Sequence, residues 1–108
     1  MRNLAPNESA ALKRLKDALA HDFSLVELRL FGSKARGDSD WESDIDVLVV
    51  LENLDWDTRM AVVDLCTDIS IDLGVLLVPV MYSRAEYGSD LTRVTPFYQA
   101  VAREGVPI

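Results

Sequence analysis

Three short stretches of the chain carry the apolar patterns of β-strands. Apolar residues occupy every second position of 25–31, which predicts a strand that buries one face. An apolar run from Ile45 that ends near Leu51 predicts a second strand, and residues 75–82 predict a third strand that is apolar on both faces and therefore largely covered. Pro79 cannot donate a hydrogen bond to a neighbouring strand, so we expect the third strand to lie at a sheet edge or to contain a bulge.

Helical spacing of apolar residues connects these strands. A first amphipathic helix begins at Pro6, and a long one covers residues 57–73. Further boundaries come from capping residues: Asp55 or Asp57 before the long helix and Gly74 after it, Ser83 before a short helix, and Thr95-Pro96 and Gly105 around the last one.

Composition and charge narrow the class of protein. With 108 residues, 49% hydrophobic and 27% charged, the sequence predicts one globular domain over residues 1–108, small enough that a homodimer or partner contact would supplement its core. The net charge of −7 argues against binding long nucleic acid. The one cysteine, Cys66, falls on the apolar side of helix 57–73 and is expected in the core. No apolar run has transmembrane length, so no membrane association is expected and the cytoplasm is the predicted location.

Two carboxylates at the start of the second strand suggest a metal site. Asp44 and Asp46 are two positions apart, so their side chains share one face with Cα atoms about 6.6 Å apart. Mg²⁺ prefers one or two carboxylates together with phosphate oxygens of a substrate. The pair is therefore a candidate site for a phosphate-bound divalent cation.

The turn after the first strand offers groups for that phosphate. Gly32 allows close approach of the backbone, and Ser33 is the expected N-cap of a short helical turn whose N–H groups can face an anion. Lys34 and Arg36 add cationic donors.

A polar loop joins the turn to the second strand. We expect its acids, Asp38, Asp40 and Glu42, to be solvated rather than to assist the metal. Trp41 fits two interpretations, stacking on a nucleotide base or partly exposed packing, and the sequence does not separate them.

This arrangement resembles a known family. Gly32-Ser33, ten further residues and then Asp44-Ile45-Asp46 are similar to the signature of polymerase-β-like nucleotidyltransferases, and the surrounding residues are most similar to the minimal nucleotidyltransferases. The resemblance implies an α/β (α+β) fold with a mixed three- to four-stranded sheet covered by helices. It also implies that the Gly-Ser turn binds nucleotide phosphates and that Asp44 and Asp46 are catalytic ligands of Mg²⁺ or Mn²⁺.

One feature of the family is missing. The resemblance implies a third carboxylate on the strand after the long helix, at or near Pro79, but residues 75–82 contain no acid. In related enzymes this group is the usual candidate base and ligand of a second metal. Asp72 is the nearest substitute.

The resemblance further implies a function and a partner. The expected reaction moves a nucleoside monophosphate from an NTP, with ATP favoured, to a hydroxyl group. A small helical HEPN-type toxin is the expected partner and acceptor, and aminoglycoside-type small molecules are a weaker alternative. The competing hypothesis is a catalytically weak or inactive antitoxin module that binds a nucleotide and acts by covering its partner.

Overall fold

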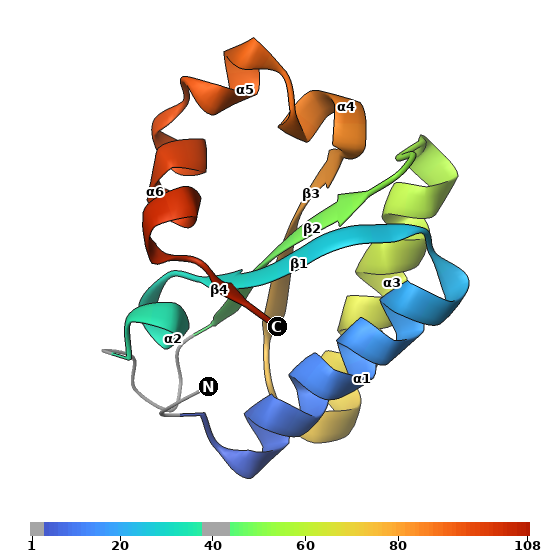
Figure 1. Cartoon of the computed structure of the whole chain (residues 1–108). Coiled ribbons are helices and arrows are strands. Elements are labelled where there is room, and N and C mark those ends of the chain that lie inside the picture. The colour runs from blue at the N-terminus through green and yellow to red at the C-terminus, as the bar shows by residue number, and fades with distance from the viewer. Residues whose placement is uncertain (1–3, 38–43) are drawn as a thin grey trace.

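The computed structural model describes residues 4–37 and 44–108. Its elements are α1 (Pro6–Asp22), β1 (Leu25–Phe31), α2 (Ser33–Arg36), β2 (Ile45–Leu51), α3 (Trp56–Leu73), β3 (Leu77–Ser83), α4 (Arg84–Tyr87), α5 (Asp90–Arg93), α6 (Pro96–Glu104) and β4 (Val106–Pro107). They form an α+β fold around one four-stranded sheet in the order β3-β2-β1-β4 (Figure 1). Strand β2 runs antiparallel to β1 and parallel to β3, so the predicted mixed sheet is confirmed.

Helices cover the two faces of the sheet unequally. Helices α1 and α3 lie side by side on one face, while the shorter helices α4 to α6 arch over the other (Figure 1). The odd-numbered residues of β2, including Val47 and Val49, are buried in the core under α1 and α3. The second cluster, under α6, takes Leu48 and Val50. Asp46 therefore shares its face with this second cluster, on the side away from the two long helices.

The exposed edge of the sheet is formed by β3, as Pro79 predicted. Alternate residues of an edge strand direct their backbone N–H groups away from the sheet. On β3 these positions include Leu77, whose N–H donates to Oγ of Ser70 at 3.1 Å, and Ser83, whose N–H donates to Oε1 of Glu86 at 3.1 Å. Between them, Pro79 has no N–H. At most of the outward positions of this edge, the backbone N–H is therefore either bonded to a side chain or absent.

Several predictions required correction. The third strand begins at Leu77 rather than at residue 75, and most of it is half-buried rather than largely covered, because the helices on either side do not extend across the edge. The cap of α2 is Gly32, with Ser33 as the first helical residue. Asp55 is confirmed as the cap of α3, its side chain accepting a hydrogen bond from the Thr58 backbone N–H. Neither α5 nor β4 was predicted. None of the helices within residues 4–37 and 44–108 is long and apolar enough to cross a membrane.

Candidate functional site

The turn and the strand carboxylates lie together at one end of the sheet. Antiparallel pairing places Phe31, the last residue of β1, opposite Asp46 on β2. Gly32 follows directly, and a Cβ atom built on it would lie 2.5 Å from Oδ2 of Asp46. Its backbone has φ +73° and ψ −155°, a conformation that is essentially restricted to glycine. Only glycine therefore allows the turn to approach this carboxylate so closely.

The charges at this end favour binding of a cation. The pKa of Asp46 is raised above its ordinary value, chiefly because the carboxyl is partly buried and then because the Asp44 carboxylate is nearby, while Arg36 opposes the shift. Two carboxylates that repel each other across a short distance are stabilised by a shared divalent ion. Asp44 is exposed and Asp46 half-buried, so the pair faces solvent from which a metal and a phosphate can enter.

Lys34 does not lie in the predicted position. Its side chain is 1% exposed, and its Nζ lies 2.5 Å from Oε2 of Glu8 on α1. The other oxygen of Glu8 accepts a hydrogen bond from the Ala5 backbone N–H at 2.8 Å, so the carboxylate joins α2 to the start of α1. A buried ammonium has no surface to offer a ligand, and the predicted phosphate contact of the Lys34 side chain is corrected to a structural ion pair.

Arg36 remains at the site. It ends the short helix α2 that follows Gly32, and its positive charge opposes the rise in the pKa of Asp46. The side chain is 45% exposed and contacts Glu104 of α6 at 3.4 Å. An exposed ion pair of this length is weak, so a phosphate group can compete with Glu104 for the guanidinium. Neither Glu8 nor Glu104 was identified from the sequence, because both contacts join segments far apart along the chain.

The sheet register locates the position of the missing third carboxylate. In the parallel β2–β3 pair Asp46 lies beside Val78, whereas Pro79 lies beside Val47 of the opposite core. The position beside Asp46 is therefore Val78, within the predicted neighbourhood of Pro79, and it is apolar. Asp72 does not replace it, because its carboxylate pairs with Arg14 at 2.8 Å on the outside of the α1–α3 layer. Within the described residues, no group of three or more His, Cys, Asp or Glu side chains is placed to hold a metal.

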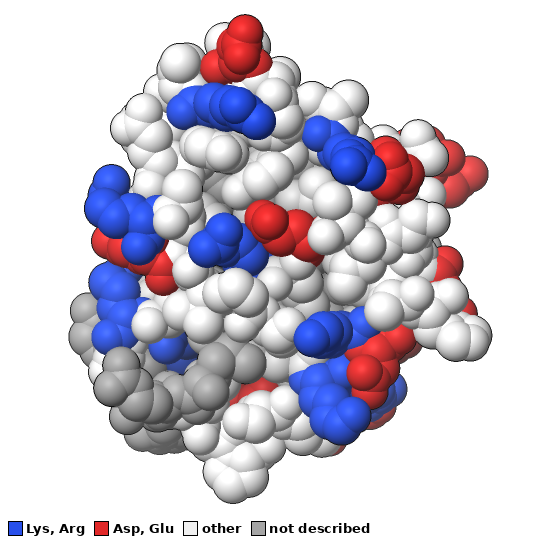
Figure 2. Space-filling view, viewed as in Figure 1, with Lys and Arg blue, Asp and Glu red and all other residues white. Residues whose placement is uncertain are grey.

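The loop residues Asp38, Asp40, Trp41 and Glu42 lie outside the described residues, so their expected roles stay predictions. On the side of the molecule seen in Figure 2, positive and negative side chains of the described residues are intermixed, with no broad patch of one sign. That distribution offers no extended positive track on this side of the kind that nucleic-acid-binding proteins use.

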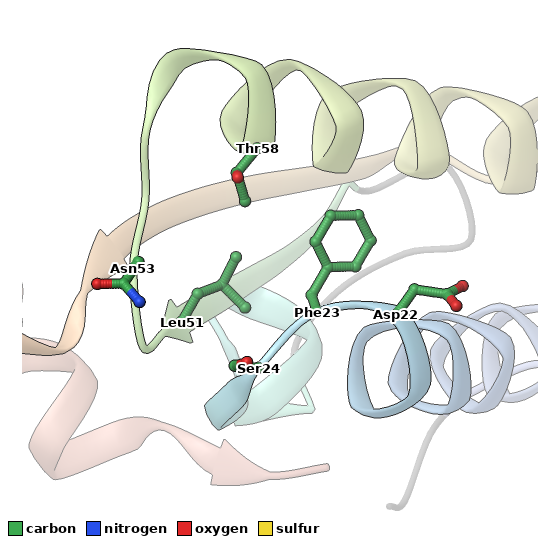
Figure 3. Close-up of a pocket in the computed structure, with 6 residues that line it drawn as sticks. All are labelled: Asp22, Phe23, Ser24, Leu51, Asn53 and Thr58. Atoms are coloured by element: carbon green, nitrogen blue, oxygen red, sulfur yellow. The ribbon is translucent and has the colours of Figure 1, made fainter.

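A small pocket lies at the other end of the sheet. It has a volume of about 210 Å³ and is lined by Asp22, Phe23, Ser24, Leu51, Asn53 and Thr58. Figure 3 shows the Phe23 ring directed into it between the end of α1 and the start of α3. Leu51 is five residues along β2 from Asp46, about 16 Å away at the usual rise of a strand. The pocket is smaller than typical ligand pockets and remote from the carboxylates, so it is not part of the candidate site.

Comparison with known proteins identifies the family of the chain. Residues 12–70 match the family described as nucleotidyltransferase domain. Two proteins of Methanocaldococcus jannaschii, both named as inferred protein adenylyltransferases, are similar to the chain. MJ0604 is 35% identical over 92% of this chain and 95% of its own length, and MJ0141 is 31% identical over 73% and 74%.

Solved structures show the same fold. A structure described as a minimal nucleotidyltransferase superposes with a TM-score of 0.63 at 26% identity and covers 96% of this chain and 97% of its own. A toxin–antitoxin complex with AMP-PNP gives a TM-score of 0.62 at 21% identity, over 95% of this chain and 72% of that one. A Shewanella oneidensis complex of a tri-AMPylated HEPN toxin with an MNT antitoxin gives 0.55 at 24% identity, over 94% and 67%.

Proposed function

Because this chain belongs to the nucleotidyltransferase family, of the polymerase-β-like minimal type, we propose that it transfers the adenylyl group of ATP to a hydroxyl of a partner protein. The proposal depends most on the close approach of the Gly32 turn to the Asp46 carboxylate, where a Cβ atom at Gly32 would lie 2.5 Å from Oδ2, because it brings a candidate phosphate-binding turn next to a candidate metal ligand. The relatives named as inferred protein adenylyltransferases support the choice of adenylyl group and of a protein acceptor.

The residues fit a divalent metal. Asp44 and Asp46 supply the hard oxygen ligands that Mg²⁺ or Mn²⁺ prefers. The pKa of Asp46 is raised, first by burial and then by the Asp44 carboxylate, so a bound cation would stabilise the ionised pair. A bound metal would neutralise phosphate charge and polarise the α-phosphoryl group. The remaining catalysis is positioning by this chain: the Gly32-Ser33 turn lies beside the triphosphate, and Arg36 donates to a phosphate oxygen in place of Glu104.

The reaction is a displacement at the α-phosphorus. The acceptor oxygen forms a bond to that phosphorus while the bond to the β-phosphate oxygen breaks, and pyrophosphate leaves with its electron pair. The chain has Val78 where a third carboxylate would face the site, so we assign removal of the hydroxyl proton to water or to a base on the acceptor.

A second candidate function follows from Val78. Without the third carboxylate, the chain can hold a nucleotide and cover a partner without modifying it. The HEPN toxin in the Shewanella oneidensis complex makes a HEPN-type protein the partner to test for both candidates.

One experiment separates the two functions. The protein is incubated with α-labelled ATP, Mg²⁺ and the purified product of the adjacent gene, beside Asp46→Asn and, as the matched control, Asp72→Asn, which removes an acid on the opposite side of the sheet. Label on the partner that disappears with Asp46→Asn and persists with Asp72→Asn supports adenylyl transfer. A stable complex without label supports the covering module, and equal labelling by both variants contradicts the assignment of Asp46.

A further inference from the structure

The outer surface of α3 carries an apolar ridge that no part of the described chain covers. Trp56 is 71% exposed, Met60 37% and Ile71 76%. Together with Thr67 they are spaced four, seven and four residues apart, which aligns them along one side of a helix. The Thr67 hydroxyl donates to the Val63 carbonyl at 2.9 Å, so its hydrogen bond is made within α3 and does not require an outside acceptor. We refer to Trp56, Met60, Thr67 and Ile71 as the α3 ridge.

A row of acids lies beside this ridge. Asp57, Asp64 and Asp68 are exposed, and within the described residues none of them forms an ion pair. Helix α3 contains four acids and one cation, a net charge of −3 out of −7 for the chain. Its other acid, Asp72, is neutralised by Arg14. The acidic character of the protein is thus concentrated along one side of an exposed apolar seam.

From this juxtaposition we infer that the α3 ridge docks an amphipathic helix of a partner protein, with an apolar seam flanked by lysine or arginine. Apolar residues at helical spacing on an exposed helix are the usual anchors for a second helix. The three acids select a basic partner, because a helix flanked by acids would place like charges against them. Asp46 lies on the opposite face of the sheet, so this docking leaves the candidate site open.

A second copy of the chain is a poorer match for the ridge. Arg59 is the only cation on α3 itself, against four acids. On the neighbouring α1, Lys13 already pairs with Asp17 at 3.1 Å and Arg14 pairs with Asp72 at 2.8 Å. Lys16 is the only α1 lysine or arginine for which the described residues provide no ion pair. Two ridges facing each other would bring the three acids of each copy together with only one arginine each, so the charges favour a different, basic chain.

Exposure alone does not distinguish the ridge, and α5 provides the matched control. Leu91 is 80% exposed and Val94 68%, values comparable to those of Trp56 and Ile71. Their neighbours are one acid, Asp90, and one cation, Arg93, so this pair has no charge preference. Replacing Leu91 and Val94 removes a similar apolar area without changing the feature on which the inference depends.

The test uses the full chain and a fluorescein-labelled synthetic helix with leucine at the seam positions and lysine or arginine on both sides. Fluorescence anisotropy at 50 mM NaCl should give saturable binding that weakens at 300 mM, where the charges are screened. Met60→Ser with Ile71→Ser should raise the Kd by about tenfold or more, since two anchors lose apolar burial. Asp64→Asn with Asp68→Asn should raise the Kd and flatten its salt dependence, and Leu91→Ser with Val94→Ser should change neither.

Two further measurements test whether the peptide covers the α3 ridge and whether the chain is a monomer. In a Trp41→Phe background, emission from Trp56 should shift to shorter wavelength as the peptide covers it. Sedimentation velocity without peptide should give a monomer. The inference is overturned if a glutamate-flanked peptide binds equally well, if the α5 variant loses binding as much as the ridge variant, if no peptide binds, or if the chain dimerises through Met60 and Ile71. ATP is absent throughout, so none of these results depends on the proposed transfer activity.

Discussion

Replacing Gly32 by alanine should lower both the stability of the fold and the affinity of the site for metal and nucleotide. The new Cβ atom would lie 2.5 Å from Oδ2 of Asp46, closer than real Cβ atoms approach other atoms, so the carboxylate or the turn must move. Alanine at φ +73°, ψ −155° costs on the order of 1–3 kcal/mol, and relief of the overlap costs a further ~1–3 kcal/mol. The expected loss is therefore about 2–6 kcal/mol, set against a total stability of roughly 5–15 kcal/mol for a domain.

Gly74→Ala is the control for this experiment. Gly74 also has a positive φ, +67°, but a Cβ there meets nothing within 4 Å. Its substitution should cost only the left-handed strain, about 1–2 kcal/mol, and should leave ligand binding unchanged. Comparing the two variants separates backbone strain from the effect on Asp46.

Urea unfolding monitored by circular dichroism gives the two stability losses, and calorimetry with Mn²⁺ and ATP gives the binding constants. A carboxylate displaced by about 1 Å can reduce the rate of the supported chemistry by roughly a hundredfold, and we expect binding by Gly32→Ala to fall below detection. If Gly32→Ala binds Mn²⁺ and ATP like the native protein and loses no more stability than Gly74→Ala, the turn does not need glycine to approach Asp46.

Three other perturbations test the remaining parts of the structure. Burial and Asp44 raise the pKa of Asp46, so its ionised form destabilises the folded state and Asp46→Asn should raise the Tm at pH 7. The gain in Tm should shrink as the pH falls towards 4, where the native carboxyl becomes protonated, and Mg²⁺ should stabilise only the native protein. No gain at pH 7 would contradict this electrostatic account. Lys34→Met leaves Glu8 buried without its partner and should cost about 3–5 kcal/mol in urea unfolding, with much of the loss recovered in the double variant that adds Glu8→Gln; an equally unstable double variant would argue against a simple pair. Burial raises the pKa of the Cys66 thiol to about 11, so iodoacetamide at pH 8 should modify it only after unfolding, and rapid labelling of the native protein would place Cys66 outside the core.

The elements that follow local rules were the ones predicted from the sequence. Alternation placed β1 within its observed bounds, and capping residues marked the start of α6 and the end of α3. Same-face spacing together with the Gly-Ser turn predicted that Gly32 and Asp46 contribute to one site, and the register of β1 and β2 brings them together.

Features set by long-range contacts could not be read from the chain. Lys34 has the spacing of a phosphate donor, and only the structure reveals that its ammonium forms an ion pair with Glu8 of α1. The strand β4 has two residues, one of them proline, and is defined by its pairing with β1 rather than by a local pattern. The sequence located the expected carboxylate position only at or near Pro79, and the parallel register was needed to identify Val78 as the residue beside Asp46, because a shift of one residue reverses the face.

The blocked backbone donors of β3 have a consequence for the behaviour of the protein at high concentration. Strand-by-strand growth into an aggregate needs a row of available N–H groups, and Ser70, Pro79 and Glu86 interrupt that row. Pro79→Val would restore one donor at an edge of valine, methionine and tyrosine residues. We expect light scattering of that variant to rise with time at concentrations where the native chain stays clear, because Pro79 keeps this edge from pairing with another chain.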